Sequence, residues 1–132
     1  MGADVQTVTV DGSTFDVRRK GDRVELIRGE ILMMSPMNPR HAVAVQLVTA
    51  ALHEAVSSAY SVRAQLPIAI GDDSEPEPDV AVVRGQPRDF VDNHPTSAEL
   101  VVEISDSTLA YDRSRKRQLY ADAGVAEYWV LD

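Results

Sequence analysis

Hydrophobic residues recur along the chain in two kinds of run, one with the period of a β-strand and one with that of an α-helix. Short runs rich in Val, Ile and Leu, bounded by Gly, Pro, Asp or Ser, predict strands. Two longer runs repeat apolar residues every three to four positions and predict helices. The predicted strands are residues 23–27, 30–34, 60–70, 79–83, 100–105 and 127–131, and the predicted helices are residues 39–59 and 111–123. Residues 60–70 form either one strand or two strands interrupted at Pro67. This order predicts a mixed α/β or α+β sheet protein.

Local signals mark the connections between these elements. Arg28-Gly29 joins the first two strands, and glycine at the second position indicates a hairpin turn. Gly124 follows the second helix, where a left-handed C-cap is usual. Residues 1–22 alternate only weakly, so they are interpreted as a poorly defined lead-in or a loose edge strand. The acidic, proline-rich residues 71–78 are interpreted as a solvated connection.

The first helix is apolar over most of its circumference, so it should pack against a sheet. Asn38 is a suitable N-cap, and Pro39 suits the first helical position. The predicted apolar stripe, widened by its neighbours, contains Val43, Leu47, Val48, Ala50, Ala51, Leu52, Ala55 and Val56.

Two charged residues lie where the pattern predicts buried positions. Glu103 lies within an apolar strand and shares a face with Val101. Lys116 lies on the stripe of the second helix that also carries Leu119 and Tyr120. The pattern therefore brings a carboxylate and an ammonium group inward towards the same region.

Asp79 opens another apolar strand and adds a second carboxylate. If the two strands are neighbours, Asp79 and Glu103 converge on one point. Carboxylates held together repel each other, so one of them takes up a proton or they share a cation. Oxygen-only ligands of this kind suit Mg²⁺ or Mn²⁺, and Lys116 could then orient a water molecule and offset charge on a phosphate. Glu30, which follows the glycine turn, is a weaker candidate for the same site.

Each of these residues also has a structural interpretation, which the pattern leaves open. Asp79 could cap its strand, and Glu103 could pair with an arginine. Lys116 could pair with Asp112 on its own helix, which stabilises a helix by only ~0.3 kcal/mol. Glu30 could be an exposed hairpin residue.

Composition narrows the class of protein. A chain of 132 residues is expected to form one domain with one core, residues 1–132. Aromatic residues make up only 5%, so the core must rely on aliphatic side chains. The lack of cysteine excludes disulfides, thiolate nucleophiles and zinc ribbons. No signal peptide or apolar run of ~18 residues is visible, so we expect a cytoplasmic protein without membrane spans.

The net charge of -8 opposes a broad nucleic-acid-binding surface, because such binding depends on neutralising phosphates. Only a local basic patch could therefore bind nucleic acid. The candidates for phosphate contacts are Arg113, Arg115 and Arg117, which surround Lys116 in the sequence. Histidine pairs with metal-ligand spacing, the P-loop and the G-x-S-x-G elbow are all missing from the sequence.

The order of short motifs resembles the Uma-two family, whose members are restriction-endonuclease-like domains of the PD-(D/E)XK nuclease superfamily. The resemblance covers roughly residues 24–132 and is most specific in D-x-x-x-K-x-x-x-Y-A-x-x-G-V-x-E-Y-W, which begins at Asp112. The preceding motifs are GEI at residues 29–31, SPMNPRH at 35–41, EPDVAVV at 77–83 and VVEIS at 101–105.

The resemblance implies a mixed sheet flanked by helices that holds a metal site. Asp79 would be the aspartate of the PD element and Glu103 the second acidic residue. The superfamily's lysine would fall two residues later, where this chain has Ser105, and Lys116 on the following helix would replace it. Glu30 would match the N-terminal glutamate that can complete the metal site. The chain departs from the family at Asp106, where proline is usual.

These observations lead us to expect a Mg²⁺- or Mn²⁺-dependent endonuclease acting on DNA. The alternatives are a catalytically inactive binding or assembly module with the nuclease fold, and a metal-dependent hydrolase of small phosphoesters. A homodimer is left open. Because family members continue after the tryptophan strand, we expect this chain, which ends at Asp132, to be shorter than they are.

Overall fold

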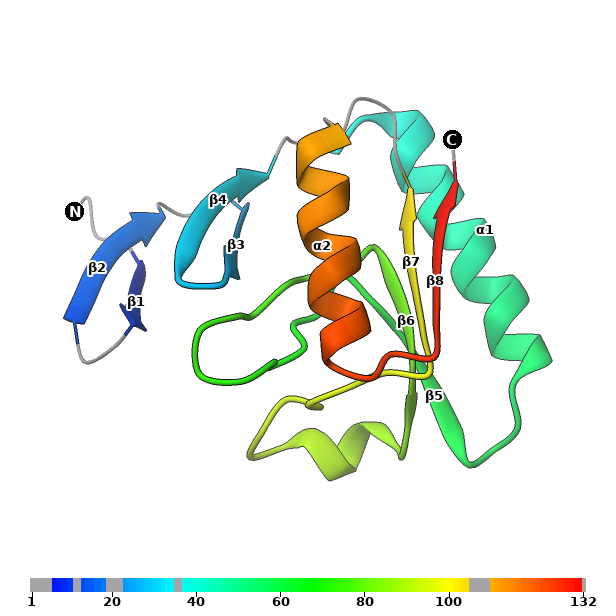
Figure 1. Cartoon of the computed structure of the whole chain (residues 1–132). Coiled ribbons are helices and arrows are strands. Elements are labelled where there is room, and N and C mark those ends of the chain that lie inside the picture. The colour runs from blue at the N-terminus through cyan, green and yellow to red at the C-terminus, as the bar shows by residue number, and fades with distance from the viewer. Residues whose placement is uncertain (1–5, 11–12, 19–22, 35–36, 105–109, 132) are drawn as a thin grey trace, which may run out of the picture.

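A computed structural model describes residues 6–10, 13–18, 23–34, 37–104 and 110–131, with side chains described for residues 24–32, 37–104 and 114–131. Its centre is a four-stranded sheet in the order β5-β6-β7-β8 (Figure 1). The strands are β5 (Tyr60–Ala64), β6 (Val80–Arg84), β7 (Leu100–Ile104) and β8 (Glu127–Leu131). The first three are antiparallel neighbours, whereas β8 runs parallel to β7.

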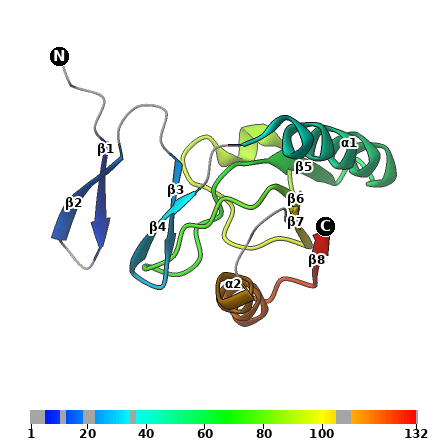
Figure 2. The same cartoon turned by 90° about the horizontal axis from the view of Figure 1, so that it is seen from above.

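Two helices cover opposite faces of this sheet. Figure 2 shows α1 (Pro39–Ala55) on one side of it and α2 (Ala110–Asp122) on the other. Parallel strands need a crossover connection, and α2 supplies it between β7 and β8. The loop before β7 contains a short 3₁₀ helix, Pro87–Phe90. The predicted fold class, a mixed sheet flanked by helices, is confirmed.

Two hairpins precede the sheet. The first, β1 (Gln6–Val10) with β2 (Ser13–Arg18), lies in the segment that the sequence predicted to be at most one edge strand. The second, β3 (Arg23–Ile27) with β4 (Glu30–Met34), agrees with the prediction. Its turn residues have positive φ angles, 49° at Arg28 and 82° at Gly29, as two-residue hairpin turns require.

Helix α1 packs on the sheet with only part of the predicted stripe, together with Val45, which was not predicted. Its N-cap is confirmed, because the Asn38 side chain accepts a hydrogen bond from the His41 amide at 2.8 Å. Val45, Val48 and Leu52 contact the strands, whereas the predicted Val43 and Leu47 are 52% and 65% exposed. An apolar pattern around most of a helix does not define one face, so the face that packs on the sheet differs in part from the predicted one. The helix also ends at residue 55, four residues before the predicted end.

The opposite face of the sheet carries the second part of the core. Tyr120 and Leu119 of α2 are buried as predicted, and Tyr120 packs with Ala81 and Val101. Gly124 ends the connection from α2 with φ 79°, in agreement with the predicted left-handed cap.

The acidic connection before β6 is packed, not solvated as predicted. Ser74, Pro76 and Pro78 are buried, and Glu75 forms a β-bridge with Leu26 of β3. The segment 60–70 is not one strand, because β5 ends at Ala64 and Gln65 has φ 57°, which breaks the extended backbone two residues before Pro67.

The acidic connection of residues 71–78 therefore joins the β3–β4 hairpin to the sheet. No helix in the described part of the chain is long and apolar enough to cross a membrane.

Candidate active site

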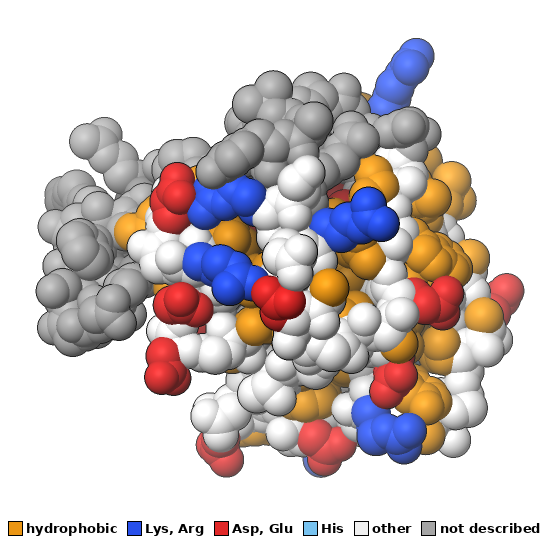
Figure 3. Space-filling model, in the orientation of Figure 1, with side chains coloured by type: hydrophobic (Ala, Val, Ile, Leu, Met, Phe, Trp, Pro, Cys, Tyr) orange, Lys and Arg blue, Asp and Glu red, His pale blue; other side chains and the backbone are white. Residues whose placement is uncertain are grey.

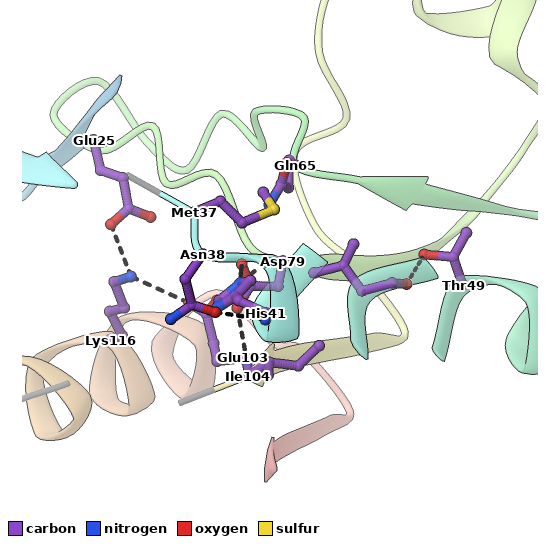
Figure 4. Close-up of polar contacts among 11 residues, drawn as sticks. Glu25, Met37, Asn38, His41, Thr49, Gln65, Asp79, Glu103, Ile104 and Lys116 are labelled. Atoms are coloured by element: carbon purple, nitrogen blue, oxygen red, sulfur yellow. Dashed lines mark hydrogen bonds and ion pairs between the residues drawn. The ribbon is translucent and has the colours of Figure 1, made fainter. Parts of the chain in front are cut away.

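Antiparallel pairing of β6 with β7 brings the two predicted carboxylates together. Val80 is paired with Val102, so Asp79 and Glu103 lie side by side at one end of the strand pair. The Glu103 carboxylate accepts a hydrogen bond from the Asp79 amide at 3.1 Å, and the Asp79 carboxylate accepts one from the Ile104 amide at 2.7 Å. Backbone amides therefore fix both carboxylates (Figure 4).

Lys116 reaches this pair from α2. Its Nζ lies 3.2 Å from Glu103 Oε2 and 2.7 Å from Glu25 Oε2, so one ammonium group bridges two carboxylates. Figure 4 shows Lys116 between Glu25 on one side and Glu103 on the other. The structure thus brings together three of the four predicted site residues, Asp79, Glu103 and Lys116.

Glu30, the fourth predicted residue, does not join them. It forms an ion pair with Arg115 at 2.8 Å, and its side chain is 59% exposed. Glu25 of β3 reaches the site instead; it is only 3% exposed and accepts a hydrogen bond from the Glu77 amide at 3.0 Å. Side chains alternate across the hairpin, and this turn and register direct Glu25 towards α2. The signal that could have found Glu25 is the one that found Glu103, a carboxylate within an apolar run.

His41 is a second residue that the sequence did not identify. Its Nε2 lies 3.0 Å from Asp79 Oδ1, and its side chain is 15% exposed. The helix cap at Asn38 places His41 in the first turn of α1. This turn lies close to Asp79, the residue that precedes β6. Histidine spacing in the sequence does not indicate His41, because the partner of His41 is an aspartate far away in the sequence.

The electrostatics of the cluster follow from burial and crowding. Burial, followed by the charges of Glu25 and Asp79, raises the pKa of Glu103 to about 7, although Lys116 and the Asp79 amide act in the opposite direction. Burial opposes the charged form of Lys116, but Glu103 and Glu25 outweigh it and raise the pKa of the ammonium. One lysine therefore does not fully neutralise the three carboxylates.

This donor set fits a hard divalent cation in its chemistry. Mg²⁺ typically takes one or two carboxylates and completes its shell with water and substrate phosphate. Asp79 and Glu103 supply such a pair, and each carboxylate oxygen can accept more than one contact. Within the described residues, no three acidic, histidine or cysteine side chains are grouped closely enough to enclose an ion by themselves.

The predicted phosphate contacts differ in their surroundings. Arg115 is only 19% exposed and is engaged by Glu30, whereas Arg117 is exposed. The side chain of Arg113, together with Ser105 and Asp106, lies outside the described residues. Figure 3 shows Lys and Arg side chains interspersed with acidic ones on the face that α2 occupies.

Comparisons with known proteins agree with this fold. A solved structure from Anabaena variabilis ATCC 29413, described as a "putative nuclease belonging to DUF820", superposes with a TM-score of 0.71 and 14% sequence identity. The match covers 81% of this chain and 64% of the other, so the chain spans less than two thirds of that protein. No curated protein matches the chain. The sequence model of the Uma2 family, described as "Putative restriction endonuclease", matches residues 13–132. The chain therefore belongs to the Uma2 family of restriction-endonuclease-like proteins.

Proposed function

We propose that this protein is a metal-dependent endonuclease that hydrolyses DNA phosphodiester bonds at a PD-(D/E)XK-type site. The observation that carries the proposal is the convergence of Asp79, Glu103 and Lys116 from three separate elements. A purely structural ion pair needs one carboxylate for one lysine, whereas the Lys116 ammonium contacts two carboxylates, and a third, that of Asp79, lies beside Glu103. Membership of the Uma2 family supports the nuclease assignment.

In this proposal, Asp79 and Glu103 hold Mg²⁺ or Mn²⁺, and Glu25 takes the assisting role that the sequence predicted for Glu30. The metal, when bound, would acidify a water molecule and polarise a phosphoryl oxygen. The Lys116 ammonium would orient the attacking water and stabilise charge that develops on the phosphate. The amides of Asp79 and Ile104 restrain the two carboxylates, so little reorganisation would be needed on binding.

DNA is the proposed substrate because of the family, and the basic residues of α2 would make the local contacts. Among the described side chains of this set, Arg117 is exposed, and Arg115 would exchange its Glu30 partner for a phosphate. Because the net charge is -8, binding should depend on few contacts and show a shallow salt dependence. A cytoplasmic location and a homodimer are consistent with this role and are tested separately by fractionation and light scattering.

The direct test is cleavage of supercoiled plasmid with Mg²⁺ or Mn²⁺ by the wild type and by Asp79→Ala, Glu103→Ala and Lys116→Ala. We expect each variant to lose cleavage by at least about a hundredfold. Glu99→Ala is the matched control, because Glu99 is exposed just before β7. Cleavage that persists in Glu103→Ala would contradict the assignment.

The second candidate is a catalytically inactive binding or assembly module. It is favoured by the bridging position of Lys116, which already neutralises part of the cluster without a metal. Calorimetric titration with Mn²⁺ separates the two, because the inactive module should bind no metal. A third candidate, a hydrolase of small phosphoesters, would cleave a nitrophenyl phosphodiester but not plasmid.

A further inference from the structure

Tyr120 has a hydroxyl group that its packing does not explain. The residue is 0% exposed, and its ring lies in the core between α2 and the sheet. No described residue accepts a hydrogen bond from its hydroxyl or donates one to it. A buried hydroxyl without a partner costs free energy, and a phenylalanine would fill the same space without that cost. Among the described residues the hydroxyl is therefore left without a partner.

The position of Tyr120 on α2 indicates where a partner would lie. Tyr120 follows Lys116 by one helical turn and shares its face. Long side chains on a helix lean towards its N-terminus, which here is the end that carries Lys116. Glu103 lies opposite that end, because Lys116 contacts it. The Tyr120 side chain therefore leans towards the carboxylate cluster.

The electrostatics of the phenol agree with this direction. Burial raises the pKa of Tyr120 well above its ordinary value, and the negative charges of Glu103 and then Glu25 raise it further. The hydroxyl thus remains protonated and can donate a hydrogen bond in the field of these carboxylates. Neither Glu103 nor Glu25 accepts a hydrogen bond from it directly, and one bridging group would satisfy both the hydroxyl and a carboxylate.

We propose that the Tyr120 hydroxyl donates a hydrogen bond to a water molecule held against Glu103 on the Lys116 side of the cluster. A water molecule fits because it can accept from the phenol and donate to a carboxylate, which the hydroxyl and carboxylate require. The inference rests on the proposed function, in which this water belongs to the hydration shell of the metal. Tyr120 is then a positioning residue for that water, alongside the ammonium of Lys116.

Tyr120→Phe tests the proposal because it removes one oxygen atom and keeps the ring. Tyr128→Phe is the matched control: its ring lies 5.5 Å from that of Tyr120, but Tyr128 is paired with Val101 in β7. Glu103 is paired instead with Val130, so Tyr128 lies farther from the cluster along the strand. Both variants remove the same atom from neighbouring aromatic rings.

The first readout is Mn²⁺ affinity by calorimetry, which does not depend on catalysis. Loss of a group that orients a metal's bound water typically lowers metal affinity or activity about 10–100-fold, so we expect at least about tenfold weaker binding in Tyr120→Phe. Tyr128→Phe should stay within about twofold of the wild type, well short of that loss. Equal Mn²⁺ affinity in Tyr120→Phe and the wild type overturns the inference and leaves the proposed function intact. A wild type that binds no Mn²⁺ overturns both.

The second readout is the division between kcat and KM in plasmid cleavage. Because the hydroxyl contacts only the water, Tyr120→Phe should lower kcat about tenfold or more and leave the KM for DNA unchanged. A higher KM with unchanged kcat would indicate a structural or substrate-binding role and overturn the inference.

A third measurement applies if Tyr120→Phe does not fold. Wild-type protein labelled with 3-fluorotyrosine gives one fluorine signal for each of the four tyrosines. The Tyr120 signal can be assigned by elimination, with the other tyrosines replaced singly by phenylalanine. Saturating Mg²⁺ should shift this signal, and a Tyr120 signal unmoved by Mg²⁺ binding overturns the proposal.

Discussion

Lys116 Nζ lies 2.7 Å from the carboxylate of Glu25 of β3, a closer approach than the 3.2 Å to Glu103 of β7. Glu25 comes from a hairpin near the start of the chain, and it is the more buried of the two carboxylates. Lys116 is therefore held as much by Glu25 of the β3–β4 hairpin as by Glu103 of the sheet.

Replacement of Lys116 by methionine should destabilise the protein strongly. The change leaves Glu25 and Glu103 buried without their shared cation, and removing one partner of a buried ion pair typically costs about 3–5 kcal/mol. Urea unfolding followed by fluorescence of Trp129, the one tryptophan in the chain, measures the loss. Arg117→Met on the same helix is the exposed control. A second substitution, Glu25→Gln, should recover part of the stability lost in Lys116→Met, and a loss below about 1 kcal/mol would contradict a buried pair.

The free energy of unfolding should fall as the pH rises from 5 to 8. The pKa of Glu103 is raised in the folded state to about 7, from an ordinary value of 4.5, so the folded protein binds a proton that the unfolded chain has released. The associated stability is complete below about pH 4.5 and is lost as the pH passes 7, with a slope of up to about 1.4 kcal/mol per pH unit. Glu25, Asp79 and Lys116 are the charged groups that face it.

Glu103→Gln isolates this contribution, because glutamine keeps the shape and does not titrate. The difference in unfolding free energy between the wild type and Glu103→Gln should vary with pH only between about 4.5 and 7. A difference that is constant over this range would show that Glu103 titrates normally.

Glu25→Gln and Glu30→Gln should differ sharply in metal binding. Glu25 is buried beside Lys116, whereas Glu30 is exposed and engages Arg115, so only the first change should weaken Mn²⁺ binding, by about tenfold or more. Calorimetry on both variants, at a temperature where each is folded, makes the comparison. Weaker binding in Glu30→Gln alone would restore the sequence-based choice of Glu30.

Arg28→Asn should stabilise the protein slightly. Arg28 has φ 49° in the hairpin turn, a conformation that arginine disfavours and asparagine tolerates, and the expected gain is about 0.5 kcal/mol. The ion pair that it gives up, Arg28 with Asp122, is half exposed on both sides and should matter little. Differential scanning calorimetry measures the change, and Arg28→Lys is the control that keeps the charge and the unfavourable φ. A lower Tm for Arg28→Asn than for Arg28→Lys would show that the ion pair matters more than the turn.

The sequence predicts well those parts of the site that depend on local periodicity. Asp79 directly precedes β6 and Glu103 lies within β7, two short apolar runs that read clearly as strands, and Lys116 shares a helix face with Leu119 and Tyr120. Antiparallel pairing and a crossover helix then bring them together. Taken alone, each of the three residues has a structural explanation. The resemblance to the Uma2 family is what indicates that they form one site.

The contacts that the sequence does not predict come from elements whose faces are ambiguous. In the segment Val24-Glu25-Leu26-Ile27, both faces of the strand carry apolar residues, so the pattern does not say which way Glu25 points. Helix α1 presents the same difficulty, because two neighbouring apolar stripes compete and the sheet selects the one with Val45. Which face of an element is buried depends on how elements distant in the sequence pack together, and the local periodicity of the sequence does not predict that packing.

The crossover from β7 through α2 to β8 links two events in folding. β8 is parallel to β7 and cannot pair with it until α2 has crossed the sheet, and that crossing carries Lys116 over Glu103. The same connection therefore places both the last strand and the ammonium group of Lys116. A fragment that ends before Glu127 would keep every residue of the site but lose β8, the strand that pairs with the strand carrying Glu103.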